Sequence, residues 1–184
     1  VATVLGALGC QWTKVGAAIA QLQSVPGRMQ SVDCNQHNQP HVLVDYAHTP
    51  DALAQAIDTA RELTSGDLWC VFGCGGDRDI SKRPVMGAIA ARGAEHVVIT
   101  SDNPRNEEPE QIMVEIAAGI TTTKAKVIQI VERAEAIAWA IHHANRHDVV
   151  LVAGKGHETY QEIMGQRHPF DDVACARNVL ERAA

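Results

Sequence analysis

The stretch Val97-Val98-Ile99-Thr100-Ser101-Asp102-Asn103-Pro104-Arg105-Asn106 joins a β-branched strand to a polar turn, and a helix is predicted to begin shortly after it, at Pro109. Asn-Pro can continue neither a helix nor a central strand, so the chain must turn where the strand ends. We expect the turn to hold Asp102 and Arg105 close together with opposite charges. Such a pair suits a ligand carrying both an ammonium and a carboxylate, because Arg binds carboxylate through two parallel hydrogen bonds. A solvated turn with a weak local ion pair is the alternative.

The composition limits the class of protein. A chain of 184 residues has the length of one domain plus a remnant of another. A hydrophobic content of 46% with 21% charged residues is typical of a soluble globular protein. The net charge of −6 without a basic stripe argues against nucleic-acid binding, and no apolar run approaches the roughly 20 residues that span a membrane. Five cysteines at irregular positions form no disulfide framework, which favours the cytoplasm.

The N-terminal segment has a character of its own. It opens at Val1 with a helical sequence that has no preceding cap and no basic signal-peptide region, so we expect this chain to be a piece of something longer. Residues 1–23 predict two short helices broken at Gly9-Cys10. The second, roughly residues 12–22, places three apolar side chains on one face: Val15, Ile19 and Leu22.

From there strands and helices alternate. Strands are predicted at residues 28–32, 41–45, 68–72, 95–100, 126–130 and 148–153. Helices are predicted at residues 50–63, 82–92, 109–120, 132–144 and 171–182, the first capped by Thr49, with a hairpin around Gly165 from 161–164 and 166–170. This alternation predicts an α/β, Rossmann-like fold: a mostly parallel sheet with helices on both faces.

Four unusual loops each follow a strand, at residues 45–49, 73–79, 101–106 and 153–158. In parallel sheets ligands bind outside the carboxyl ends of the strands. We therefore expect the four loops to share one rim and to form a single site there.

The first two loops are ambiguous when taken alone. Asp45 and His48 at a strand end, facing a helix N-terminus, suit a nucleotide, but they also fit a capped helix start. The glycine-rich loop 73–79 leaves Arg78 free to meet a carboxylate or phosphate, although glycine turns after strands are common. Cys70 and Cys74 fit buried thiols better than a metal site, because one lies within the strand and no second pair exists.

Two features near the C-terminus also have alternatives. Gly154-Lys155-Gly156-His157-Glu158 offers backbone donors and a carboxylate, and Lys155 resembles a phosphate-binding lysine only superficially. His142, His143 and His147 have metal-ligand spacing, but His is favourable at any helix C-terminus. We assign no metal ligands.

Together these loops resemble the C-terminal domain of the Mur ligases, which build the peptidoglycan precursor peptide. The motifs that carry the resemblance are Asp45-Tyr46-Ala47-His48-Thr49-Pro50-Asp51-Ala52-Leu53, Gly73–Asp79 with Lys82-Arg83-Pro84, Asp102-Asn103-Pro104-Arg105 and Gly154–Glu158. The resemblance runs from about Pro26-Gly27-Arg28 to the end of the chain. The third motif is similar to the signature of the members that add meso-diaminopimelate to UDP-N-acetylmuramoyl-L-alanyl-D-glutamate.

The resemblance implies ATP-dependent amide synthesis through an acyl phosphate, with Mg²⁺ stabilising the charge. It implies contacts to meso-diaminopimelate from Arg78, Asp102, Asn103, Pro104, Arg105, Gly154 and Glu158. It implies contacts to ATP from Arg28, Asp45 and His48. Arg105 would bind the distal carboxylate that lysine lacks, which disfavours a lysine-adding relative.

The resemblance also defines what is missing. Residues 1–24 are similar to the last helices of the ATP-binding central domain, and residues 25–184 to the amino-acid-binding C-terminal domain. The UDP-binding domain and the phosphate-binding loop, metal ligands and carbamylated lysine of the central domain are not found here, so no catalytic residue is assigned and the chain alone should not catalyse. A stand-alone amino-acid-binding module is the alternative from a different class.

Overall fold

The core of the molecule is a six-stranded sheet. The structure is a computed structural model, and it describes residues 2–19, 21, 25–32 and 38–182. The strand order is β1-β2-β6-β3-β4-β5. In sequence order the strands are β1 (Gln30–Val32), β2 (His41–Asp45), β3 (Leu68–Phe72), β4 (His96–Ile99), β5 (Lys126–Gln129) and β6 (Val149–Ala153). All neighbours pair in parallel except β1, which runs antiparallel to β2. The predicted α/β class with a mostly parallel sheet is confirmed.

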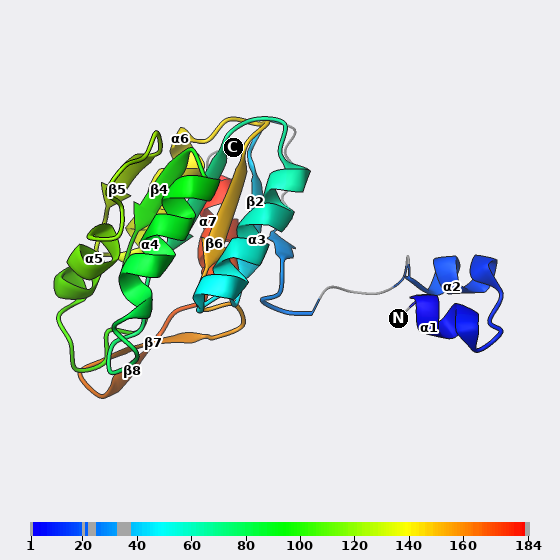
Figure 1. Cartoon of the computed structure of the whole chain (residues 1–184), viewed down its shortest axis with the longest axis horizontal. Helices are drawn as coiled ribbons and strands as arrows, with labels where there is room; N and C mark the ends of the chain where they lie inside the picture. The colour runs from blue at the N-terminus through cyan, green and yellow to red at the C-terminus, as the bar shows by residue number, and fades with distance from the viewer. Residues whose placement is uncertain (1, 20, 22–24, 33–37, 183–184) are drawn as a thin grey trace.

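Helices cover both faces of this sheet (Figure 1). On one face lie α3 (Pro50–Leu63), α4 (Lys82–Gly93) and α5 (Pro109–Ala117), and on the other lie α6 (Arg133–His143) and α7 (Asp172–Arg182). Neighbouring strand residues alternate between the two cores: Leu151 packs with the first layer and Val150 with the second. Burial on both faces explains why the central strands are continuous apolar runs.

The structure begins the first strand later than predicted. Met29 has a φ of 42°, outside the strand region, and its N–H donates to the Asp45 carboxylate at 2.8 Å. This bond holds the turn, so β1 starts at Gln30. The predicted helix from residue 109 to 120 also stops early, at Ala117. A Cβ on Gly119 would lie 1.8 Å from the carbonyl oxygen of Pro84, so the chain must leave the helix to pass α4.

The predicted hairpin is confirmed as β7 (Tyr160–Ile163) paired with β8 (Gln166–Pro169). Its two turn residues, Met164 and Gly165, both have positive φ, as a two-residue hairpin turn requires. Figure 1 shows the hairpin beside the end of the sheet where the loops after β3 and β6 emerge.

Two short helices, α1 (Ala2–Ala7) and α2 (Trp12–Ile19), contact each other and lie apart from the sheet in Figure 1. Of the three side chains predicted to share one face, Val15 is buried, Ile19 is 42% exposed, and Leu22 lies outside the described residues. The proposed domain boundary at residue 24 also falls outside them and stays a prediction. In the described part of the chain, every helix is too short or too polar to cross a membrane.

Candidate functional site

A cavity of about 410 Å³ lies where the loops after β2, β3, β4 and β6 meet. Each of the four loops contributes side chains or backbone to it, and β7 adds one ring. The lining residues are Tyr46, His48, Gly75, Arg78, Lys82, Asp102, Asn103, Arg105, Gly154, Glu158 and Tyr160. The prediction that the four loops share one rim is confirmed.

Two carboxylates of this cavity each keep one oxygen without a protein donor in the described part of the chain. Asp102 accepts from the Asn103 N–H through Oδ1 at 2.7 Å. Glu158 uses Oε2 to accept from Asn103 Nδ2 at 2.8 Å and from Lys155 Nζ at 3.2 Å. Asp102 Oδ2 and Glu158 Oε1 remain available to a ligand. A pair of free carboxylate oxygens is suited to an ammonium group.

Two guanidinium groups face the same space. Arg78 is exposed and donates only to the carbonyl of Asp77, at 3.3 Å, among the described residues. Arg105 donates to the carbonyl of Gly76 at 2.8 Å, and its acidic neighbour is Glu162, with Nε and Oε2 3.7 Å apart. That distance is too long for a hydrogen bond, so much of the bonding capacity of Arg105 remains for a ligand.

Asp102 and Arg105 both line the cavity, and the alternative, a weak local ion pair between them, is not found among the described residues. The hairpin positions Arg105: its N–H donates to the carbonyl of Glu162 at 3.0 Å, and Met164 N–H donates to the carbonyl of Arg105 at 2.7 Å. These bonds hold Arg105 at a φ of 52°, a conformation that a non-glycine residue adopts at a cost of about 1–3 kcal/mol. The guanidinium is thereby set beside Gly76 and Glu162.

Close backbone contacts bring the loops together. A Cβ on Gly154, whose φ is 118°, would lie 2.7 Å from Asp102 Oδ2. A Cβ on Gly76 would lie 1.9 Å from the carbonyl oxygen of Pro104. Pro104 itself is buried and is not part of the lining, so it shapes the turn rather than facing the cavity.

The residues expected to face ATP gather around the Tyr46 ring. The Arg28 guanidinium lies 4.9 Å from its centroid, and the His48 and His157 rings lie 4.6 Å and 5.1 Å away. His48 lines the cavity, whereas Arg28 lies beside it. Asp45 is 8% exposed and commits one oxygen to the backbone of Met29.

Two buried arginines, Arg83 and Arg133, hold the loops of the site in place, a role that the sequence did not predict. Arg83 pairs with Glu107 and Glu115 and donates to the carbonyl of Gly75. Arg133 makes a two-pronged bond to Asp172, each contact 2.8 Å. It also donates to the carbonyl of Ser101, two residues after β4, at 3.3 Å and to the carbonyl of Ala153, the last residue of β6, at 3.0 Å. The sequence carries no local signal for these roles, because their partners are distant along the chain.

Cys70 and Cys74 are buried thiols, the interpretation favoured from the sequence over a metal site. Burial raises the pKa of Cys70 and of Cys74 to about 12, so neither is a reactive thiolate. In the part of the chain that the structure describes, no three His, Cys, Asp or Glu side chains are arranged to hold a metal ion. His143, from the histidine cluster, bonds to the carbonyl of Trp139 through Nδ1 instead.

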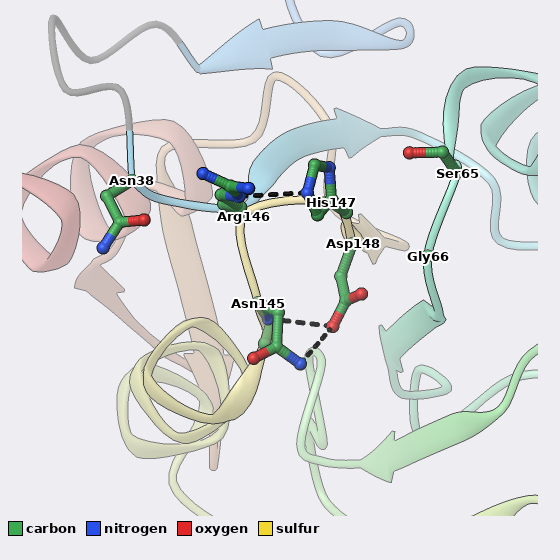
Figure 2. A pocket seen from close by; sticks show the side chains of 8 residues that line it. Asn38, Ser65, Gly66, Asn145, Arg146, His147 and Asp148 are labelled. Carbon is green, nitrogen blue, oxygen red and sulfur yellow. Dashed lines mark hydrogen bonds between the residues drawn. The ribbon is translucent and has the colours of Figure 1, made fainter.

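A larger hollow of about 900 Å³ lies at the opposite end of the sheet, before β6 (Figure 2). Its carboxylate, Asp148, is 5% exposed and is occupied by its own chain. Oδ1 accepts from the Asp67 N–H at 2.9 Å, and Oδ2 accepts from the Asn145 N–H at 2.8 Å and the Trp69 indole at 3.2 Å. This hollow is larger than the first cavity, but both oxygens of its carboxylate already accept hydrogen bonds that hold the fold together.

Comparison with known proteins defines the class of protein. Residues 27–156 match the family model described as the Mur ligase, glutamate ligase domain, and the chain belongs to the Mur ligase family.

Among individual relatives, the chain is 52% identical over 179 residues to the UDP-N-acetylmuramoyl-L-alanyl-D-glutamate–2,6-diaminopimelate ligase of Acidovorax sp. strain JS42, covering 96% of this chain and 35% of that protein. It is 50% identical to the ligase of the same description from Janthinobacterium sp. strain Marseille, covering 98% and 37%.

The solved structures agree. A structure described as UDP-N-acetylmuramoyl-L-alanyl-D-glutamate–2,6-diaminopimelate ligase superposes with a TM-score of 0.81 at 43% identity, covering 99% of this chain and 37% of that one. A bifunctional folylpolyglutamate synthase/dihydrofolate synthase from Yersinia pestis CO92 shares the fold, with a TM-score of 0.59 at 22% identity over 88% of this chain and 32% of that one. The chain thus spans about a third of the length of these relatives.

Proposed function

We propose that this chain is the amino-acid-binding part of an ATP-dependent ligase that adds meso-diaminopimelate to UDP-N-acetylmuramoyl-L-alanyl-D-glutamate through an acyl phosphate. The observation that carries the proposal is the pairing of charges in the cavity. Arg78 and Arg105 offer two cationic groups, and Asp102 and Glu158 offer two free carboxylate oxygens. A ligand with two carboxylates and two amines matches all four.

Arg105 is the residue proposed to distinguish diaminopimelate from lysine. Lysine has no second carboxylate, so it would leave the guanidinium with only the Gly76 carbonyl and the loose contact to Glu162. A charged group left unpaired in a closed site is costly, which makes discrimination of this kind large. Asn103 and Gly154 border the same space, and Pro104 contributes by shaping the turn.

ATP is proposed to lie along the Tyr46 side of the cavity. Arg28 and His48 approach the Tyr46 ring there, and a guanidinium near an aromatic ring suits a nucleotide with its phosphates. Asp45 is proposed to meet the ribose through the oxygen not bonded to Met29. Mg²⁺, the phosphate-binding loop and the catalytic groups are proposed to come from domains that this chain does not contain. The free cysteines of the described residues fit a reaction in the cytoplasm.

The proposal is tested by a chimera. Residues 25–184 replace the equivalent C-terminal part of the Acidovorax ligase, and product formation is followed with meso-diaminopimelate or L-lysine. We expect turnover with diaminopimelate and at least about a hundredfold lower kcat/KM with lysine. A folded chimera that uses both amino acids equally would contradict the proposal.

Calorimetric titration of the 184-residue chain itself tests the alternative, a stand-alone amino-acid-binding module. Saturable binding of meso-diaminopimelate but not of L-lysine, together with an inactive chimera, would favour a stand-alone binding module. An active chimera without binding by the isolated chain would mean that the further domains complete the site.

A further inference from the structure

Lys155 lies in the loop after β6 with no solvent exposure, and it is not part of the cavity lining. An ammonium removed from water needs partners that replace its hydration. Lys155 has three. Nζ donates to Asn103 Oδ1 at 3.0 Å and to Glu158 Oε2 at 3.2 Å, and it lies 5.6 Å from the centroid of the Tyr160 ring. All three partners line the cavity, so the buried ammonium of Lys155 lies directly behind the lining and contacts it.

The first consequence concerns Asn103. Its side-chain oxygen accepts from Lys155 Nζ and also from the Glu162 N–H, at 2.9 Å. Two donors occupy both lone pairs of that oxygen. The amide is therefore fixed with Nδ2 toward Glu158, to which it donates at 2.8 Å. Asn103 is only 3% exposed and has one remaining N–H for a ligand.

The second consequence concerns Glu158. Oε2 receives both Asn103 Nδ2 and Lys155 Nζ, whereas Oε1 has no donor among the described residues. The side chain of Glu158 is 20% exposed and lines the cavity. The two bonds to Oε2 hold the carboxylate in one orientation and leave Oε1 for the ligand. Without Lys155 a single bond from Asn103 would remain.

We propose that Lys155 is a positioning residue of the amino-acid site, which acts through Asn103 and Glu158 to present Glu158 Oε1 to an ammonium group of the ligand. The proposal rests on the proposed function, since it takes that ligand to be the amino-acid substrate. Lys155 itself does not touch the ligand. Its contribution is to fix two side chains that do.

The test is kinetic and uses the chimera described above. Lys155→Met keeps the length of the side chain and removes its charge, and Lys126→Met removes an exposed charge from β5 as the control. We expect Lys155→Met to raise the KM for diaminopimelate at least tenfold while the KM for ATP changes less than twofold. Lys126→Met should change neither. Equal changes in both KM values, or no change in either, would overturn the proposal.

A double variant tests the route of the effect. If Lys155 acts through Glu158, then Lys155→Met combined with Glu158→Gln should raise the KM for diaminopimelate little more than the worse single change does. Multiplication of the two single effects would show that they are independent and would contradict the proposal.

One measurement does not depend on how the variants fold. In the unchanged chain, the side-chain amide protons of Asn103 should exchange with solvent at least tenfold more slowly than those of exposed Asn106, as followed by NMR. Equal exchange would mean that the network is not formed. A wild-type chimera that fails to add diaminopimelate would count against the proposed function instead, and so the two failures are distinguishable.

Discussion

The two ends of the sheet use carboxylates in opposite ways. At the amino ends of the strands, Asp148 has both oxygens occupied by donors of its own chain. At the carboxyl ends, Asp102 and Glu158 each keep an oxygen free and share a cavity with two guanidinium groups. The hollow at the amino ends is the larger of the two, at about 900 Å³ against about 410 Å³. In this protein the unused bonding capacity of the lining, rather than volume, marks the candidate site.

The largest expected effect comes from Arg105 at the carboxyl end. Arg105→Ala in the chimera should lower kcat/KM for diaminopimelate at least about a hundredfold, roughly 3 kcal/mol, because a ligand carboxylate loses its charged partner. The exposed Arg92→Ala on α4 serves as the control and should leave kcat/KM within about twofold. Steady-state kinetics measures both. An Arg105→Ala enzyme that keeps the wild-type rate would remove Arg105 from the substrate site.

The next effect is on stability, at the amino end. Asp148→Asn replaces one acceptor oxygen by an NH₂ group that faces existing donors, so at least one buried donor loses its partner. We expect the free energy of unfolding to fall by about 2–3 kcal/mol in urea titrations. Amino-acid binding should not change. Asp58→Asn, at an exposed position of α3, should cost less than about 0.5 kcal/mol. A stable Asp148→Asn variant with impaired binding would reverse the roles assigned to the two ends.

The same carboxylate predicts a dependence on pH. Burial alone would raise the pKa of Asp148, but hydrogen bonds from the backbone N–H groups of Asn145 and Asp67 and from the Trp69 indole outweigh it and hold that pKa below its usual value. A depressed folded-state pKa adds stability above the unfolded value of about 3.9, and this stability is lost as the pH falls through the folded value. The stability difference between wild type and Asp148→Asn should therefore shrink below pH 4. A constant difference from pH 6 to pH 3 would show that the charge of Asp148 does not contribute.

The smallest effect is expected within the larger hollow. Arg146 and His147 are exposed there and bond to each other, with Nε and Nε2 2.9 Å apart (Figure 2). Arg146→Ala should change the free energy of unfolding by less than about 0.5 kcal/mol and leave amino-acid binding unchanged. Thermal unfolding and calorimetry of the same sample measure both. A loss of diaminopimelate binding would mean that this hollow takes part in function.

Much of the fold was predictable because its signals are local. Thr49 followed by Pro50 predicts the start of α3, and the structure begins that helix at Pro50 with the Thr49 side chain accepting from the Ala52 N–H. The apolar run at Leu68–Phe72 predicts β3 with the observed bounds. The errors fall where a distant contact overrides the local pattern. Asp45 holds the Met29 turn and delays β1, and α5 ends early, at Ala117, before Gly119 passes close to the Pro84 carbonyl.

The candidate site also has a part that the sequence predicts and a part that it does not. Its loops could be placed on one rim because parallel strands bring their carboxyl ends to one edge, but the partners of individual side chains could not. The acidic neighbour of Arg105 is Glu162, which the hairpin brings to it from a distant part of the chain. Tyr160 enters the lining from the same hairpin.

The sequence by itself determined the alternation of strands and helices, the turn at Asn103-Pro104 and the types of charge at the rim, since each follows from residues close together in the chain. Only the tertiary structure decided which charged side chains are paired within the protein and which remain available to a ligand. Arg133 is the buried partner of Asp172 and Lys155 of Asn103, while Arg78 stays open to the cavity. Strand order and register set these pairings. A hydrogen bond between distant residues forms only after the sheet has brought them together.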